Sequence, residues 1–262
     1  MKRRSFVKAS LLTGAAATII PSTSMATPAI DDAEFYELRV YTLKNDTQQK
    51  LVEDYWKNAA IPALNRLGIK NIGAFTELKP AGQTKLYVFI PYSSMAKFVS
   101  VTDNLNKDAD HQKSGAAYLN APATEPAYER IESSLLKAFA HMPKMAIPGS
   151  GPRIFELRQY QSASEAAGKK KIEMFNDEGE INIFKRLGFK PVFFGETVIG
   201  PLRPNLTYMV TFEDMAAHDS HWKAFVDDAE WKKISVVPGY ADAELVSKIT
   251  STIIAPAAYS QI

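Results

Sequence analysis

The chain has 262 residues, of which 46% are hydrophobic and 23% charged, as is usual for a globular protein with a sizeable core. It contains no cysteine, which excludes disulfides, thiolate metal sites, a cysteine nucleophile and a lipid-modified N-terminal cysteine. The formal net charge is +2, but four basic and no acidic residues lie before residue 27, so the remainder is slightly acidic. That balance argues against nucleic acid as a partner.

The first 26 residues have the pattern of a secretory signal peptide. Arg3 and Arg4 precede an apolar run over 11–20, and small residues lead to Ala26, after which we expect cleavage. The apolar run is short for a membrane span, although an uncleaved anchor is the alternative. The paired arginines followed by Ser-Phe-Val-Lys resemble a bacterial twin-arginine signal. We therefore expect a periplasmic or otherwise exported protein, free of the membrane after cleavage, with a tether over 27–33.

Hydrophobic periodicity predicts strand, helix, strand, strand, helix, strand in the first half of the remaining chain. The helix over 48–67 begins after side chains that can cap it, Pro62 is expected to bend or break it, and Gly68 suits a left-handed cap at its end. A second helix is expected to begin after Ser94. The predicted strands cover 34–42, 69–78, 86–91 and 128–139.

The second half repeats this plan at an offset of about 120 residues. The segment 35–41 (FYELRVY) matches 154–160 (IFELRQY), and Arg-Leu-Gly at 66–68 recurs at 186–188. Five matched blocks in the same order indicate an internal duplication. The predicted domains are 34–142 and 153–262, joined by a linker over 143–152 that contains prolines and glycines.

This order of elements predicts an α+β fold in which two ferredoxin-like βαββαβ units pack sheet to sheet as a pseudo-dimeric α+β barrel. Alternation along the first strand gives it two faces. We expect the side chains at 36, 38 and 40 to meet the helices, and Glu37, Arg39 and Tyr41 to lie between the sheets.

Charged residues between two sheets require partners. The two Glu-Leu-Arg segments could therefore form a structural ion network, or they could line a ligand pocket. Aromatic residues at helical spacing in the second half could pack in the core or cover such a pocket. The candidate ligand-binding residues are Glu37, Arg39, Tyr41, Glu156, Arg158, Tyr160, Trp222 and Trp231.

The histidines give weaker indications. Asp214, His218 and His221 would share a helix face and could ligate a non-haem metal, but we prefer a solvated face with Asp214 as the helix cap. His111 could ligate haem, although an exposed histidine is the preferred interpretation. The lysines at 169–171 are interpreted as a solvated face. No catalytic residue is predicted. No cofactor is predicted either, and haem or a non-haem metal is the alternative.

Several motifs together resemble the NIPSNAP family: Glu-Leu-Arg-x-Tyr and Arg-Leu-Gly in both halves, the spacing of tryptophan, phenylalanine and aspartate over 222–231, and the segment 133–139. The resemblance implies the dimeric α+β barrel superfamily, which holds cofactor-free monooxygenases, haem-degrading enzymes, lactone isomerases and non-catalytic members. It supplies no agreed catalytic residues. Thr102 and His111 stand where the second half has Trp222 and Trp231, so a ligand site is not expected to be equivalent in the two halves.

The expected role is therefore the binding of a small, largely apolar molecule within the barrel. The first alternative is a cofactor-free monooxygenase or isomerase, and the second is a non-catalytic scaffold or interaction protein whose barrel is fully packed. We also expect that two chains could pair as a homo-oligomer through exposed strand edges, because an incompletely closed barrel leaves such edges uncovered.

Overall fold

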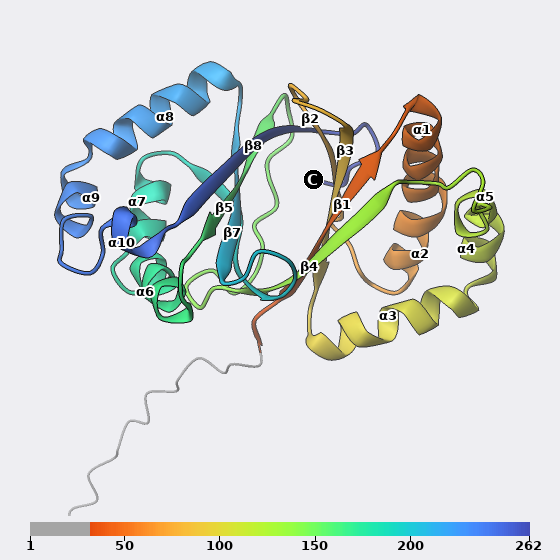
Figure 1. Cartoon of the computed structure of the whole chain (residues 1–262), viewed down its shortest axis with the longest axis horizontal. Helices are drawn as coiled ribbons and strands as arrows, with labels where there is room; N and C mark the ends of the chain where they lie inside the picture. Colours follow the sequence, from red (N-terminus) through yellow and green to blue (C-terminus); the bar gives the residue numbers. More distant parts are fainter. Residues whose placement is uncertain (1–31) are drawn as a thin grey trace, which may run out of the picture.

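The computed structural model describes residues 32–262, so the predicted signal peptide and nearly all of the tether lie outside the described residues. Eight strands form one closed barrel, with helices on two opposite sides (Figure 1). The strand order is β1-β3-β2-β8-β5-β7-β6-β4. Within residues 32–262, none of the helices combines the length and the hydropathy that a membrane crossing requires.

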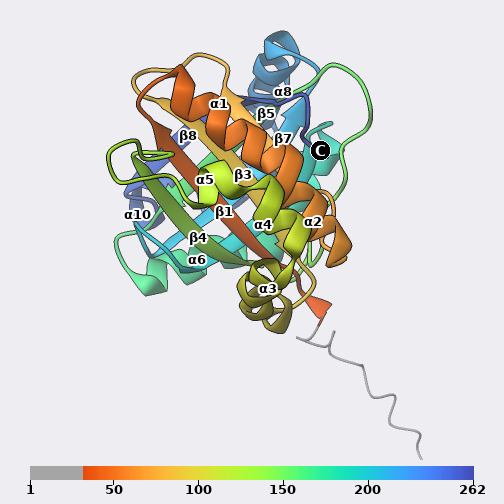
Figure 2. The ribbon, with the colours of Figure 1, turned by 90° about the vertical axis from the view of Figure 1, so that its right-hand side faces the viewer.

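The first half supplies four strands and the helices that cover their outer face (Figure 2). Asn45 and Ser94 cap the two main helices, and Gly68 has the expected positive φ of 79°. Pro62 does not break the helix, since a π-helical turn precedes it and a proline near the start of the next segment needs no N–H partner. The elements are β1 (Phe35–Leu43), α1 (Asp46–Tyr55), η2 (Trp56–Ala60), α2 (Ile61–Arg66), β2 (Gly73–Glu77), β3 (Thr84–Tyr92), α3 (Met95–Lys107), α4 (Ala109–Ser114), α5 (Ala116–Leu119) and β4 (Arg130–Ala138).

The second half repeats the plan, which confirms the predicted order of elements. Ser164 and Asp214 cap its helices, and Gly188 takes the place of Gly68 with a φ of 87°. The elements are β5 (Ile154–Gln161), α6 (Glu165–Asn176), α7 (Glu180–Arg186), β6 (Lys190–Ile199), β7 (Asn205–Phe212), α8 (Met215–Asp227), α9 (Ala229–Ile234), α10 (Asp242–Leu245) and β8 (Lys248–Pro256).

Two strand pairs between the halves close the barrel. The strand β4 pairs with β6, where Lys137 lies opposite Glu196, and β2 pairs with β8, where Thr76 lies opposite Ala255. Every barrel strand in the described part of the chain therefore has two neighbours. The expectation that the barrel leaves open strand edges is therefore wrong. Self-association of two chains stays a prediction, without such edges as its basis.

The inside of the barrel is filled by large apolar side chains from both halves. The ring centroids of Tyr36, Phe89 and Phe193 lie 4.6–5.1 Å from one another, and all three residues are fully buried. The expected facing of β1 is wrong, because Tyr36 and Leu38 point into the barrel whereas the odd-numbered residues of β1 face the helices. The side chains inside the barrel are buried, so uncharged residues of β1 point there, and its charged residues lie in the helix-facing layer, closer to solvent.

Candidate functional site

The first Glu–Arg pair lies between β1 and the helices. Arg39 donates to both carboxylate oxygens of Glu37, at 2.6 and 3.1 Å, and its guanidinium lies 5.7 Å from the ring of Trp56. The hydroxyls of Tyr92 and Ser133 donate to the same carboxylate. Burial opposes ionisation of Glu37, but the charge of Arg39 and these hydrogen bonds hold its pKa below the ordinary value. The Arg39 side chain is 26% exposed, so solvent reaches this pair.

The second pair is more deeply buried and has more partners. Arg158 donates to Glu156 at 2.9 Å and lies 4.3 Å from the ring of Trp222, whose indole N–H donates to the same carboxylate at 2.7 Å. Ser251 donates to Glu156 at 2.6 Å, and Nε2 of His218 approaches it to 3.2 Å. The side chains of Glu156 and Arg158 are 1% and 17% exposed. The structure thus brings Glu156, Arg158 and Trp222 together in the helix-facing layer, outside the barrel interior.

The Asp214, His218 and His221 side chains do not converge. Asp214 accepts from the N–H of Ala217, which is the capping role preferred from the sequence. His218 lies between Glu156 and Asp219, whereas His221 packs against aromatic rings that include Phe189. Among residues 32–262, no cluster of three His, Asp or Glu side chains is arranged to hold a metal ion.

His111 is buried, so the expectation of an exposed side chain is wrong. Its Nε2 lies 3.1 Å from the Tyr55 hydroxyl and its Nδ1 lies 3.0 Å from the Leu105 carbonyl. Tyr55 in turn stacks on Tyr118 at 3.9 Å between centroids, and these rings shield the imidazole from solvent. The aromatic counterpart in the second half, Trp231, packs half-buried against Phe225.

Lys171 is also buried, which corrects the interpretation of the lysines as a solvated face. Its ammonium lies 3.2 Å from Glu180 and 3.0 Å from Asp242, and its side chain is 1% exposed. Burial raises the pKa of Glu180, and the lysine opposes this shift. A signal for this burial was present in the sequence, since Lys171 aligns with Val52 on the core-facing side of the first helix.

A cavity with an apolar lining lies beside α6, and none of the eight candidate residues lines it. Its volume is about 560 Å³, within the range of roughly 300–1,000 Å³ that small-molecule sites occupy. The end of β4, the segment that follows it, α6 and β6 form its walls. The lining comprises Asp32, Ala33, Lys137, Ala138, Phe139, Ala140, Pro143, Ile172, Asn176 and Glu196.

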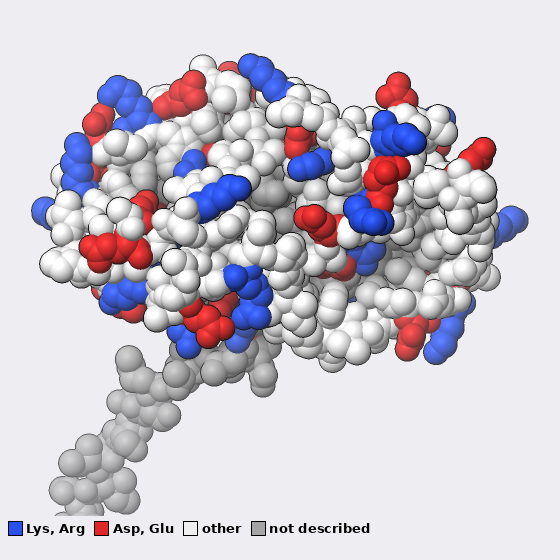
Figure 3. All heavy atoms as spheres, in the orientation of Figure 1, with Lys and Arg blue, Asp and Glu red and all other residues white. Residues whose placement is uncertain are grey.

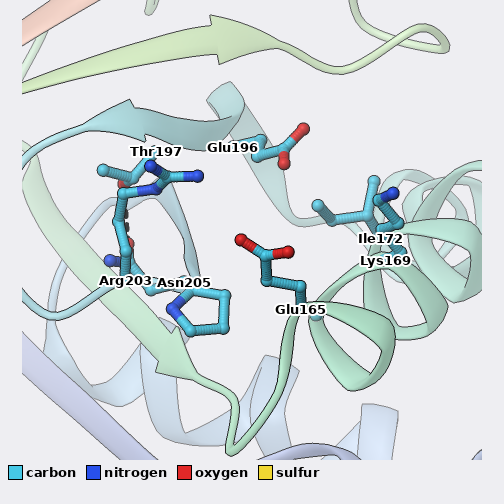
Figure 4. A pocket seen from close by; sticks show the side chains of 9 residues that line it. Glu165, Lys169, Ile172, Glu196, Thr197, Arg203 and Asn205 are labelled. Atoms are coloured by element: carbon cyan, nitrogen blue, oxygen red, sulfur yellow. Dashed lines mark hydrogen bonds between the residues drawn. The ribbon is translucent and has the colours of Figure 1, made fainter.

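A second cavity of about 220 Å³ also lies beside α6, and Figure 4 shows the side chains that line it. The two cavities adjoin at Ile172 and Glu196, which line both, and we refer to them together as the α6 groove, with an apolar and a charged part. Figure 4 shows Glu165 and Lys169 reaching the charged part from α6, and Arg203 from the loop between β6 and β7. Sequence reasoning missed this groove because its walls come from segments that are distant in the chain.

The duplication supplies a counterpart in the first half, a cavity of about 330 Å³ beside α1. There the position of Ile172 is occupied by Glu53 and that of Glu196 by Thr76, whereas Ala258 takes the place of Ala140. Gln49, Asp54 and Lys57 also line it, so the first-half cavity is polar. Equivalent backbone positions therefore form an apolar cavity in one half and a polar one in the other.

Solved structures share this architecture at low sequence identity. A candidate monooxygenase from Fusobacterium nucleatum is 11% identical with a TM-score of 0.57, over 86% of this chain and 92% of that chain. A candidate monooxygenase from Lactobacillus acidophilus is 11% identical with a TM-score of 0.58, over 86% and 94%. An anthrone oxidase-like protein is 12% identical with a TM-score of 0.51, over 87% and 93%. At these identities the likeness concerns the fold alone.

The family assignment comes from the sequence. No curated protein matches this chain significantly. The model of the NIPSNAP family matches it twice, over residues 36–143 and 155–261, which together make up most of its length. Each match contains one Glu–Arg pair and one Arg-Leu-Gly turn. The chain therefore belongs to the NIPSNAP family, and it carries two copies of the NIPSNAP domain.

Proposed function

We propose that this protein binds a small, largely apolar molecule, and that the molecule lies in the cavity beside α6. The apolar lining of this cavity carries the proposal, because the corresponding cavity of the first half is polar. Small-molecule sites combine an apolar wall with a few polar groups, which Lys137, Asn176 and Glu196 supply here. The barrel interior, where the ligand was first expected, is occupied by buried side chains that include Phe75, Phe89 and Phe193.

Filling the cavity tests the proposal. The substitution Ala140→Trp places an indole in the second-half cavity, and Ala258→Trp places the same group at the corresponding position of the first half. Both alanines are exposed, so both variants should fold. We expect Ala140→Trp to weaken binding of the neutral fluorescent probe N-phenylnaphthylamine about tenfold or more, a loss of roughly 1.4 kcal/mol, and Ala258→Trp to leave it unchanged. Equal affinities in the two variants would contradict the site.

A cofactor-free oxygenase or isomerase is the second candidate, and the geometry around Arg158 favours it. This cation lies against Trp222 and donates to the Tyr160 hydroxyl at 3.3 Å, so it could stabilise an oxyanion that forms on a bound substrate. The name of one structural neighbour, an anthrone oxidase-like protein, suggests an anthrone as the first substrate to try. Oxygen uptake with an anthrone by the wild type, and its loss in Arg158→Gln, would support catalysis. No uptake by the wild type would contradict this activity.

We also propose that the chain is exported through the twin-arginine pathway and processed after Ala26. The support is the sequence of residues 1–26 alone. The mass of the protein recovered from the periplasm of a twin-arginine-competent bacterium should correspond to a chain beginning at Thr27. Recovery of the chain only in the cytoplasm, with Met1 retained, would contradict export.

A further inference from the structure

We infer that the ligand of the α6 groove is an amphipathic anion, with its apolar body beside Ile172 and one negative charge, such as a carboxylate, at Arg203 and Lys169. This inference rests on the proposed function and adds the chemical class of the ligand. The two cavities of the groove carry it, because they adjoin at Ile172 and Glu196 and differ in polarity.

The length of the groove suits a molecule with two distinct ends. Glu165, Lys169, Ile172 and Asn176 follow one face of α6 at spacings of three and four residues. At a rise of 1.5 Å per residue, the stretch from Glu165 to Asn176 extends for about 16 Å. An extended chain of that length would reach from the apolar part of the groove to the charged part.

Three cations and three carboxylates line the groove, but one of the carboxylates pairs with a lysine that lies outside the lining. Asp32 at the apolar end pairs with Lys144 at 3.1 Å, so this carboxylate is already neutralised. Three cations remain, Lys137, Lys169 and Arg203, and they face only two carboxylates. One positive charge is therefore in excess, and a single anionic group on the ligand would balance it.

The two carboxylates do not occupy the cations. Glu165 lies in the first turn of α6, where the helix dipole stabilises a negative charge, and Glu196 lies opposite Lys137 across the β4–β6 pair. No ion pair within 4.0 Å joins Lys169 or Arg203 to any residue in the range 32–262. Both cations are thus available to a ligand.

Buried polar side chains fix the loop that carries Arg203. The side-chain amide of Asn205 donates to the Pro201 and Leu202 carbonyls at 3.2 and 2.9 Å, and Asn205 accepts from the buried Thr197 hydroxyl at 2.7 Å. The backbone that carries Arg203 is therefore held beside the groove, so only the side chain of this residue has to be ordered on binding.

The first half has no such pair of cations. Gln83 occupies the position of Arg203, and Lys50 occupies that of Lys169 but pairs with Asp54 at 2.7 Å. The positive charge in excess is therefore a property of the second-half groove, where the apolar cavity also lies. Lys50 provides a matched control, because it is an exposed lysine at the same position of the equivalent helix.

The test uses displacement of N-phenylnaphthylamine at pH 7.5 by dodecanoic acid, dodecanol and dodecylamine, which share one chain and differ in the end group. We expect the wild type to bind the acid about tenfold more tightly than the alcohol, and the amine more weakly than both. The double variant Arg203→Gln/Lys169→Gln should lose this preference while its affinity for dodecanol stays unchanged. The Lys50→Gln variant should retain the preference.

The outcomes separate the inference from the proposed function. If the wild type binds the acid and the alcohol equally, or the amine most tightly, the inference is wrong and the binding site itself stands. If the double variant keeps the preference for the acid, the anion does not lie at Arg203 and Lys169. If N-phenylnaphthylamine does not bind, or if it binds equally to Ala140→Trp and Ala258→Trp, the proposed function itself has failed.

Discussion

The two halves of the barrel share a backbone plan but fill the layer between helices and sheet differently. In the first half, Tyr55 stacks on Tyr118, whose hydroxyl contacts that of Tyr41 at 3.2 Å. In the second half, the buried ammonium of Lys171 lies beside Glu180. The first half thus has an apolar side chain, Val52, where the second half buries the ammonium of Lys171.

The positions that kept their residues and those that changed have different roles. Gly68 and Gly188 end equivalent helices, and Arg66 and Arg186 make equivalent ion pairs, so the retained residues fix the backbone. The retained Glu–Arg pairs lie in the helix–sheet layer, whereas the changed residues line part of that layer and the cavities beside α1 and α6. Since a fold alone does not determine function, we look among the changed positions for a ligand site that only one half has. The mixed charges on the face in Figure 3, where neither sign forms a continuous patch, point to no other site there.

The largest effect should come from breaking the ion pair that only the second half has. The substitution Lys171→Met leaves Glu180 buried without its partner, and we expect it to lower the free energy of unfolding by about 3–5 kcal/mol. Because burial raises the folded-state pKa of Glu180, the loss should grow as the pH rises above the ordinary value of 4.5 and shrink below it. Urea unfolding at several pH values measures both effects.

Two controls sharpen this prediction. Lys170→Met changes the adjacent lysine, which is partly exposed, and it should alter stability little. The double variant Lys171→Met/Glu180→Met replaces the buried pair by apolar groups and should recover most of the loss, because such replacements are often neutral or stabilising. A double variant as unstable as Lys171→Met would show that the loss comes from packing rather than from the unpaired carboxylate.

An intermediate effect is expected at the Glu–Arg pairs that both halves share. Glu156→Gln should lower the free energy of unfolding by about 2–3 kcal/mol and Glu37→Gln by about 1–2 kcal/mol. The difference is expected because the second pair is less exposed and its carboxylate also accepts from Trp222. The folded-state pKa of Glu37 is lowered, so its contribution is complete above the ordinary value of 4.5 and disappears as the pH falls through the lowered pKa. The Glu37→Gln loss should therefore vanish in acid. Equal losses of unfolding free energy in Glu156→Gln and Glu37→Gln at pH 7 would contradict the expected difference between the two pairs.

The smallest effect should come from the Arg-Leu-Gly arginines. Arg66 donates to Asp108 and Arg186 to Asp228 through paired hydrogen bonds of 2.8–3.0 Å at the protein surface. Solvent screens both ion pairs, so Arg66→Ala and Arg186→Ala should lower the melting temperature only slightly and by similar amounts. A large loss for one variant alone would show that the two turns have diverged in their structural role.

The sequence by itself determined the duplication, the order of the elements and the helix ends. Repeated blocks at one offset reveal the duplication, and side chains such as Asn45, Ser94 and Gly68 act on the backbone within a few residues of themselves. Such local effects do not depend on the rest of the fold. They explain why the predicted order and the helix caps agree with the structure.

The tertiary structure decided which face of each strand is enclosed and which residues meet. Alternation separates Tyr36 and Leu38 from Glu37 and Arg39, but both faces carry aromatic residues, so the period of two does not reveal which face points into the barrel. Closure of the barrel decides it, because an interior without solvent excludes unpaired charge. The α6 groove likewise exists only because β4 crosses to pair with β6, which brings the end of the first domain against a helix of the second.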